Sequence, residues 1–300
     1  MAFTQRREYL FLYSVKDANP NGDPLNANHP RYDEETDQIW VSDVRLKRTV
    51  RDYWKQMGQT IFVDGEAKTA KMRIKELQEQ LQVTKGPEVC GGCLDTRLFG
   101  VTYPIDSESF SWIGPVQFKW GRSLHRAKVE LVQGTAAFAT KDESNQRSFR
   151  NEYIVPYALI GAYGIANQFA AAQTGATDED LALLREGLWN GTLNLITRSK
   201  IGHEPCLLVE IVYKEGFCGA IGSLDDKVRL VKAGGEEFNR EEQLGLRGLR
   251  EAALDMTELG RCIAAKKEHI AQVRLQKGAP LQLKGLAEMK QALGERVVEE

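Results

Sequence analysis

The chain has 300 residues, 42% of them hydrophobic and 27% charged, a balance typical of a globular protein and not of a fibre or a disordered tail. Forty basic residues against 42 acidic ones give a net charge of −2, which excludes a wholly basic, DNA-coating protein but allows a local basic face. No apolar run approaches the roughly 20 residues that a membrane-spanning helix needs, and five cysteines fit a reducing interior. We therefore expect a cytoplasmic protein with no membrane contact.

The N-terminal region predicts a strand, a polar loop and a helix. Glu8–Val15 is short, apolar and aromatic, as a buried strand should be, and Asp17–Pro24 is a loop dense in turn formers. A brief strand is expected over Ile39–Val41. Ser42 is a suitable N-cap for the helix that follows it.

That helix has two faces when it is read at about 100° per residue. One face is apolar, and the other is a ridge of basic residues interrupted only by Asp52: Arg45, Lys47, Arg48, Arg51 and Lys55. Charge alone favours a solvated surface, because most basic runs need no ligand. Phosphate binding is the alternative.

The middle of the chain predicts a charged helical insertion and then a projecting hairpin. Gly65–Val83 is the helical stretch, a turn is expected at Cys90–Cys93, and Val116–Trp120 is expected to be a strand. The hairpin has arms over Val129–Thr140 and Ser148–Val155 around the polar turn 141–146, with an excess of basic residues.

The C-terminal half predicts two helices, a strand and a further helical segment. Pro156–Ala172 is rich in alanine and predicts a buried helix, and Thr177 caps a second helix that runs to about Leu195. Leu207–Tyr213 is an apolar strand. Beyond Gly235 the composition favours helix, with one long segment near Glu241–Gln276.

Two motifs raise the question of a metal. Asp17 to Asp23 match the first half of a calcium-binding loop, but Asn28 stands where the bidentate glutamate is needed. Cys90 and Cys93 could form half of a zinc site or a redox pair only if the fold supplied further ligands, such as His203, Cys206 or Cys218. Two thiols in a loop is the simpler interpretation, and we expect no metal and no cofactor.

No motif requires an enzyme. The four histidines are scattered, and the phosphate-binding glycine loops of nucleotide enzymes are absent from the sequence. Only His29, beside the first loop, is considered as a general acid or base. What remains is a basic helix face, a basic hairpin with aromatic residues, and the polar, basic turn Thr197–Gly202. Arg and Lys suit phosphates and aromatics stack on bases, so single-stranded RNA is the leading ligand.

The residues then show a resemblance to a known family. The strand, the loop Asp17-Ala-Asn-Pro-Asn-Gly-Asp-Pro24 and the segment Val41–Arg48 resemble the guide-RNA (crRNA)-binding backbone subunit of type I CRISPR Cascade complexes, a RAMP family, and within it the subtype I-B and I-C branch. The likeness covers roughly residues 8–235. It continues in the same order through Gly114–Phe118, Phe138–Lys141, Tyr153–Ile160, Trp189–Gly191 and Ile196–Lys200.

The resemblance implies an α+β fold shaped like a hand. An RRM-like palm, a modified ferredoxin fold, is expected over 1–60, 96–121 and 155–235. Helical fingers would occupy 61–95, a β-hairpin thumb 122–154, and a helical C-terminal segment 236–300.

The resemblance also implies a function. The subunit would be a non-catalytic scaffold whose copies stack head to tail along crRNA in a filament, alongside other Cascade subunits in antiviral defence. Its thumb would kink the guide at regular intervals and leave the bases between kinks free to pair with target DNA. The alternative is a RAMP-type endoribonuclease that processes guide RNA, with His29 as the acid or base.

The residues expected at the RNA follow from the motifs that match the family. In the first loop they are Asn19, Asn21 and Gly22, and on the palm helix Arg45, Lys47, Arg48 and Arg51. In the thumb they are Thr140, Lys141, Arg147 and Phe149, and in the basic turn Arg198 and Lys200.

Overall fold

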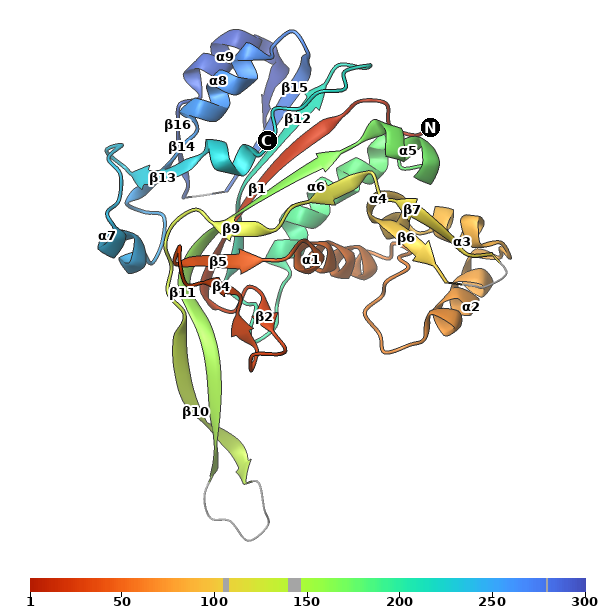
Figure 1. Cartoon of the computed structure of the whole chain (residues 1–300), viewed down its shortest axis with the longest axis horizontal. Helices are drawn as coiled ribbons and strands as arrows, with labels where there is room; N and C mark the ends of the chain where they lie inside the picture. Colours follow the sequence, from red (N-terminus) through yellow and green to blue (C-terminus); the bar gives the residue numbers. More distant parts are fainter. Residues whose placement is uncertain (105–107, 140–146, 279) are drawn as a thin grey trace.

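The computed structural model describes residues 1–104, 108–139, 147–278 and 280–300, and it is an α+β structure built around a large sheet (Figure 1). The strand order is β17-β15-β12-β1-β11-β9-β5-β4, with β8 and β10 also paired to β11. At the centre lies β1 (Arg7–Ala18), antiparallel to β11 (Arg147–Ala166) and to β12 (His203–Tyr213). The expected strands Glu8–Val15 and Leu207–Tyr213 are confirmed as parts of β1 and β12.

Side chains of β1 alternate between two cores because successive residues of a strand point to opposite faces. Tyr9, Phe11 and Tyr13 belong to the core beneath the helices α1 (Asp43–Gln56) and α6 (Asp178–Leu193). Leu10 and Leu12 belong to the core beneath the C-terminal elements. The sheet is therefore covered on both faces, and β1 connects the two cores.

Helix α1 begins where the sequence predicts. The side chain of Ser42 accepts a hydrogen bond from the backbone N–H of Arg45 at 3.3 Å, which satisfies one of the free amides of the first turn. Its apolar side packs on α6, and the Trp54 indole donates to the carbonyl of Leu183 at 2.9 Å. Gly187 permits this approach, since a Cβ there would lie 2.8 Å from Val50 Cγ1.

The remaining elements of the first half surround this sheet and helix pair. Three short strands extend the main sheet beyond β11: β9 (Gly121–Ser123), β5 (Gln38–Val41) and β4 (Tyr32–Asp33). β8 (Val116–Phe118) also pairs with β11, while β2 (Gly22–Asp23) and β3 (His29–Pro30) form a separate two-stranded sheet in the first loop. The insertion consists of α2 (Ala70–Leu81), α3 (Gly86–Gly92), α4 (Leu94–Phe99), β6 (Gly100–Tyr103) and β7 (Phe110–Ile113).

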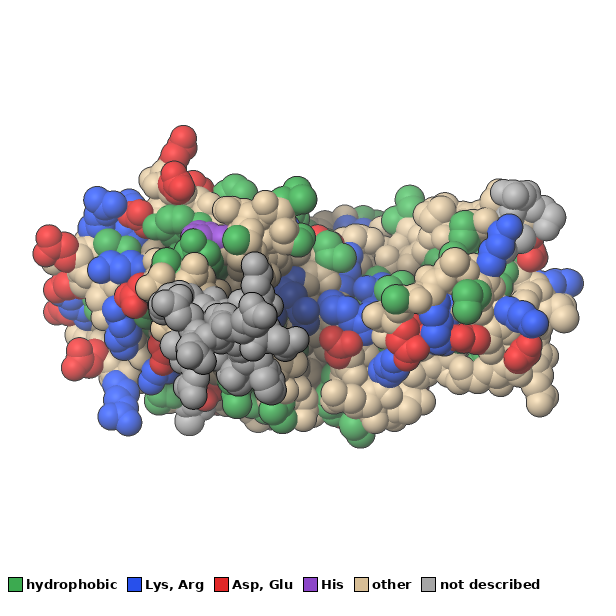
Figure 2. Space-filling view, turned by 90° about the horizontal axis from the view of Figure 1, so that it is seen from below, with side chains coloured by type: hydrophobic (Ala, Val, Ile, Leu, Met, Phe, Trp, Pro, Cys, Tyr) green, Lys and Arg blue, Asp and Glu red, His purple; other side chains and the backbone are tan. Residues whose placement is uncertain are grey.

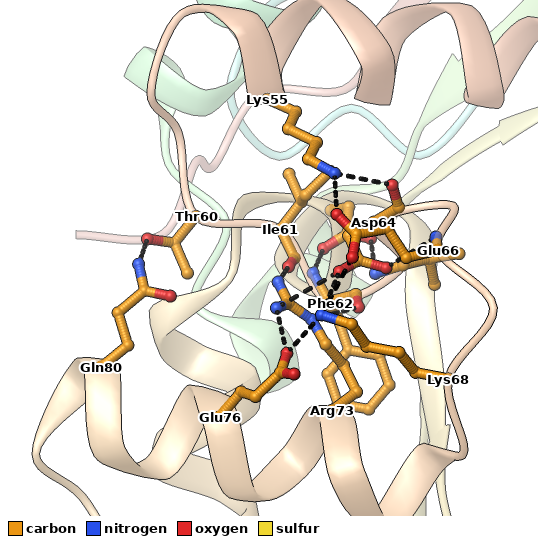
Figure 3. Close-up of polar contacts among 12 residues, drawn as sticks. Lys55, Thr60, Ile61, Phe62, Asp64, Glu66, Lys68, Arg73, Glu76 and Gln80 are labelled. Atoms are coloured by element: carbon orange, nitrogen blue, oxygen red, sulfur yellow. Dashed lines mark hydrogen bonds and ion pairs between the residues drawn. The ribbon is translucent and has the colours of Figure 1, made fainter.

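A dense polar network holds the loop 60–68 to α2 (Figure 3). The Arg73 guanidinium donates to the carbonyls of Ile61 and Phe62, at 2.6 and 3.2 Å, and lies 3.4 Å from Asp64. Lys55 of α1 pairs with Glu66 at 2.8 Å. The insertion is therefore tied to α1 by charge as well as by apolar packing.

The turn expected at Cys90–Cys93 is wrong. Residues 86–92 form helix α3, and Gly92 lets this helix lie close to α2, because a Cβ at that position would be 2.6 Å from Leu81 Cδ1. Gly92 therefore serves close packing between helices, whereas a Cβ at Gly91 would meet open space, and a Gly-Gly pair in the sequence does not distinguish such packing from a turn.

A second correction concerns Pro156–Ala172, which is not a helix. The expected hairpin is present as β10 (Glu130–Ala139) with β11, but β11 continues through the sheet to Ala166, and only α5 (Gln168–Thr174) is helical. Both faces of this part of β11 are buried against the two cores, so the polar alternation of a half-exposed strand is missing. Its pairing with β1, Tyr13 opposite Ile160, overrides the helix propensity of alanine.

The helical segment predicted over 236–300 is also wrong. The C-terminal part alternates between strands and short helices, and β15 joins the main sheet beside β12. The short strands of this segment lie among charged residues, so its amino-acid composition is like that of a helical segment, and composition alone does not distinguish the two. The elements are η1 (Leu224–Lys227), β13 (Arg229–Lys232), α7 (Arg240–Gly245), β14 (Ala252–Asp255), α8 (Thr257–Ala265), β15 (Ile270–Lys277), β16 (Gln282–Lys284), α9 (Ala287–Leu293), η2 (Gly294–Arg296) and β17 (Val297–Glu299). Within the described residues, no helix has the length and apolar character to cross a bilayer.

His125 generates a prediction for stability. Its ring is buried, Nδ1 lies 2.7 Å from the carbonyl of Arg126, and Nε2 accepts from the backbone N–H of Leu159 at 3.2 Å, so only the neutral ring satisfies both contacts. Burial lowers the pKa of His125 to about 4. Between about pH 6.5 and 4 the unfolded chain binds a proton that the folded chain refuses, so the free energy of unfolding falls by about 3 kcal/mol as the pH drops through this window.

Denaturant unfolding at several pH values measures this effect. His125→Gln should lower stability at pH 7 but flatten this acid dependence, whereas His269→Gln, at an exposed site, should leave it intact. An unchanged slope in His125→Gln contradicts the assignment.

Candidate nucleic-acid interface

Segments far apart in the sequence meet at one end of the three central strands. The backbone N–H of Asn19 donates to Ser199 O, and that of Lys16 to Gly202 O, each at 2.9 Å, which joins the first loop to the basic turn. The Asn21 side chain accepts from the backbone N–H of Ser42 at 2.7 Å and so connects the same loop to the start of α1. The structure thus brings together the predicted residues of the first loop, of the start of α1 and of the basic turn.

At this junction lie three basic side chains, those of Arg45, Lys200 and His203. The Lys200 ammonium donates to the carbonyl of Asn19, and the His203 ring contacts the carbonyl of Lys200 and stacks on Tyr13 with 5.8 Å between ring centroids. Arg45 donates to Thr49 Oγ1 at 3.0 Å. Among the described residues, neither Arg45 nor Lys200 forms an ion pair with a carboxylate.

Burial is the main cause of the pKa shifts in this cluster, and the repulsion of neighbouring cations adds to it for Lys200 and His203. Burial, and then the charge of Arg45, lower the pKa of Lys200 to about 8. Burial also lowers the pKa of Arg45 and takes the pKa of His203 down to about 4, where the nearby Lys200 and Arg45 charges act in the same direction. The charge of Asp52 acts on Arg45 in the opposite direction, but among the described residues neither cation has a carboxylate at ion-pair distance, and such half-buried cations favour the binding of an anion.

Beside the cluster lies a cleft of about 340 Å³. Its walls come from the first loop (19, 27 and 28), the base of the hairpin (151–153) and the basic turn (197–199). Arg198 is 66% exposed on its rim and pairs with Glu152 at 3.1 Å. At the same hairpin base, His29 lies against Tyr153 with 4.7 Å between ring centroids. Figure 2 shows basic side chains gathered in a hollow near α1, between the insertion and the C-terminal part.

Gly22 is required by close packing of the first loop. A Cβ there would lie 1.9 Å from Asn28 Oδ1 and 3.0 Å from its backbone oxygen, so any other residue would displace Asn28 from the cleft wall. Gly22 therefore shapes the loop that carries Asn19 and Asn21.

The continuous basic ridge expected on α1 is wrong. Lys47 is buried, lies over the Phe99 ring at 5.6 Å and pairs with Asp43 at 3.1 Å. Arg48 contacts Asp52 at 2.6 Å and donates to the carbonyl of Val63 at 2.9 Å. The physical reason is that the insertion covers this side of α1, and a helical wheel contains no information about what an insertion covers.

Arg51 is the ridge residue that the insertion covers most clearly. Its guanidinium is buried, lies 5.1 Å from the Phe99 ring centroid and pairs with Asp95 at 2.8 Å. Asp95 also accepts the backbone N–H groups of Phe62 and Val63, at 2.6 and 3.1 Å. Arg51 therefore fixes the insertion to α1, and its charge is already neutralised.

The hairpin residues are only partly described. Thr140 and Lys141 lie outside the described residues. Arg147 and Phe149 lie in β11, where their backbones pair with Ala139 and Thr135. These four residues stay predictions.

Sequence reasoning missed His203 as a member of this site. The only signal was its position directly after the basic turn, and it was considered there only as a zinc ligand. Its placement depends on the pairing of Val15 with His203 between β1 and β12, which a local motif does not reveal.

The cysteine pair has the properties of core thiols. Cys90 and Cys93 are buried and free, and burial, followed by the charge of Asp95, raises the pKa of each to about 12. They pack with Tyr103 and Ile74 and with Leu77 and Val89, respectively. In the part of the chain that the structure describes, no group of three histidine, cysteine or acidic side chains is arranged to hold a metal.

Comparisons with known proteins agree on one family. Residues 5–243 match the family model described as CRISPR-associated protein Cas7. A protein of that name from Haloferax volcanii is 29% identical over 290 residues, covering 86% of this chain and 83% of its own length. Two solved chains, from a CRISPR RNA-guided surveillance complex and from its pre-nicking form, have similar folds. Their TM-scores are 0.53 and 0.55 at 16% and 12% identity, covering 98% and 94% of this chain and 94% and 95% of theirs.

The Arg51–Asp95 pair yields a prediction. Arg51→Met leaves Asp95 buried without its cation, so we expect the free energy of unfolding to fall by about 3 kcal/mol. RNA affinity per folded molecule and its salt dependence should not change. Lys55→Met, which breaks an exposed pair with Glu66, is the control and should lower the free energy of unfolding much less than Arg51→Met does. Denaturant unfolding together with RNA titrations checks both, and a reduced salt slope in Arg51→Met contradicts the structural role.

Proposed function

The chain belongs to the Cas7 family of CRISPR-associated proteins, the crRNA-binding backbone subunits of type I CRISPR surveillance complexes, and we propose that it acts as a non-catalytic scaffold whose copies stack head to tail along the guide. The observation that carries this proposal is the cluster of Arg45 and Lys200, two half-buried cations that form no ion pair with a carboxylate among the described residues. A phosphate of the RNA backbone supplies the missing charge without regard to base sequence.

The contacts of the guide follow from this placement. Arg45 and Lys200 bind one phosphate, and the exposed Arg198 binds a neighbouring one at the rim of the cleft. Asn19, Asn21 and Gly22 form the wall of the groove. We leave Lys47, Arg48 and Arg51 out of the contact set, because these side chains hold α1 to itself and to the insertion.

The remaining parts take their roles from the family. The main sheet is an RRM-like palm, the insertion forms the fingers, and the β10–β11 hairpin is the thumb that kinks the guide through Thr140, Lys141, Arg147 and Phe149. The bases between kinks pair with target DNA, and other Cascade subunits complete the complex. An open, head-to-tail contact between copies produces a filament and not a closed ring.

Nuclease protection tests the proposal. The protein bound to guide RNA and digested with nuclease should leave fragments whose lengths rise by a constant step with each copy bound. The double variant Arg45→Ala/Lys200→Ala should lose this ladder and lower the slope of log affinity against log salt by about one for each phosphate contact removed.

The control is Lys71→Ala/Lys75→Ala on the exposed side of α2, which removes the same charge and should keep the ladder. A single protected fragment contradicts stacking. Discrete cleavage of repeat RNA that disappears in His29→Ala would instead establish the endoribonuclease role, in which His29 acts at the neighbouring cleft.

Lys200 makes RNA affinity depend on pH. Its pKa is about 8 in the free protein, so the ammonium loses its proton as the pH rises above this value, whereas a bound phosphate favours the charged form. Affinity should therefore be constant near pH 7 and fall by up to tenfold per pH unit above about 8. Lys200→Arg, which keeps its charge, should bind independently of pH from 7 to 9.5. Equal pH profiles for the two proteins contradict the contact.

A further inference from the structure

The side chain of Asn19 holds an acceptor that the fold leaves unused. Asn19 is 3% exposed, and its Nδ2 donates to the carbonyl of Asn28 at 2.7 Å, which fixes the amide so that Oδ1 is the free atom. No donor among the described residues reaches that buried oxygen. A buried acceptor without a donor is destabilising, so folding alone does not explain it.

Two hydrogen bonds fix the backbone of Asn19. The backbone N–H of Asn19 donates to Ser199 O at 2.9 Å, and its carbonyl accepts from the Lys200 ammonium. Asn19 therefore lies next to the cation cluster, and it lines the cleft of about 340 Å³ between the first loop, the hairpin base and the basic turn. The unused acceptor and the phosphate-binding cations belong to one site.

The chemistry of nucleic-acid backbones identifies the missing donor. Phosphate oxygens and the ring oxygen of the sugar only accept hydrogen bonds, and the sole donor of the backbone is the ribose 2′-hydroxyl, which DNA lacks. Arg45 and Lys200 bind phosphates of RNA and DNA alike. An acceptor beside them distinguishes the two.

We infer that Asn19 Oδ1 accepts a hydrogen bond from the 2′-hydroxyl of the guide nucleotide whose phosphate lies on Arg45 and Lys200, and that Asn19 thereby selects RNA over DNA. This inference rests on the proposed function, because it assumes a guide bound at the cluster. Asn19 would then contact the sugar, on a surface whose other proposed contacts are with phosphate charges.

The test uses guides with a single 2′-deoxy substitution moved along the chain. With wild-type protein, one position in each footprint should cost about three- to tenfold in affinity, as expected for one hydrogen bond. With Asn19→Ala, RNA binds more weakly, and the deoxy substitution at that position costs nothing further. Asn26→Ala, at an exposed asparagine of the same loop, should keep the full deoxy penalty.

The outcomes separate the inference from the proposed function. If RNA binds but no deoxy position costs affinity, the inference fails while the scaffold role stands. A penalty that persists in Asn19→Ala, or that follows the identity of the base and not the sugar, also overturns it. Failure to bind the guide at all contradicts the proposed function itself. The wild-type series alone decides the first case, even if Asn19→Ala does not fold.

Discussion

The pairing of β1 with a strand on each side is the constraint on which the rest of the structure depends. Because β11 and β12 both run antiparallel to β1, the end of β1 lies beside the beginning of β12 and the hairpin base of β11: Val15 pairs with His203, and Ala18 with Val155. The first loop, the basic turn and the hairpin therefore all leave the sheet at the same end of the three central strands. The cation cluster and the cleft lie at this end of the strands.

Among the described residues, a buried acidic charge within the sheet is paired, whereas two half-buried cations at this end of the strands are not. Glu210, fully buried on β12, contacts Arg7 at 2.8 Å and Arg274 at 3.0 Å, and so its charge is balanced within the fold. Arg45 and Lys200 have no such partner among the described residues, and burial lowers the pKa of both. This contrast between a balanced and an unbalanced charge is what we expect to separate a structural ion pair from a site that binds an external anion.

Local signals were sufficient for some elements and not for others. The Ser42 cap, the apolar β1 and the Thr177 cap of α6 depend on neighbours in sequence, and each was predicted. The part of β11 from Pro156 to Ala166 was mistaken for a helix because burial on both faces removes the alternation that identifies a strand. Lys47 and Arg51 are buried because the insertion covers their side of α1. His203 lies at the cation cluster because of the register between β1 and β12. Both depend on contacts between residues far apart in the sequence.

The length of β11 has a consequence for how the hairpin can vary. One strand of 20 residues forms both the centre of the sheet and an arm of the hairpin, with no hinge between them among the described residues. Each pair of residues inserted in both arms would extend the hairpin by roughly 7 Å and keep every side chain on its face. A single inserted residue would exchange the two faces. The hairpin can therefore change its reach in steps of two residues per arm, with each side chain kept on its face and the core left unchanged.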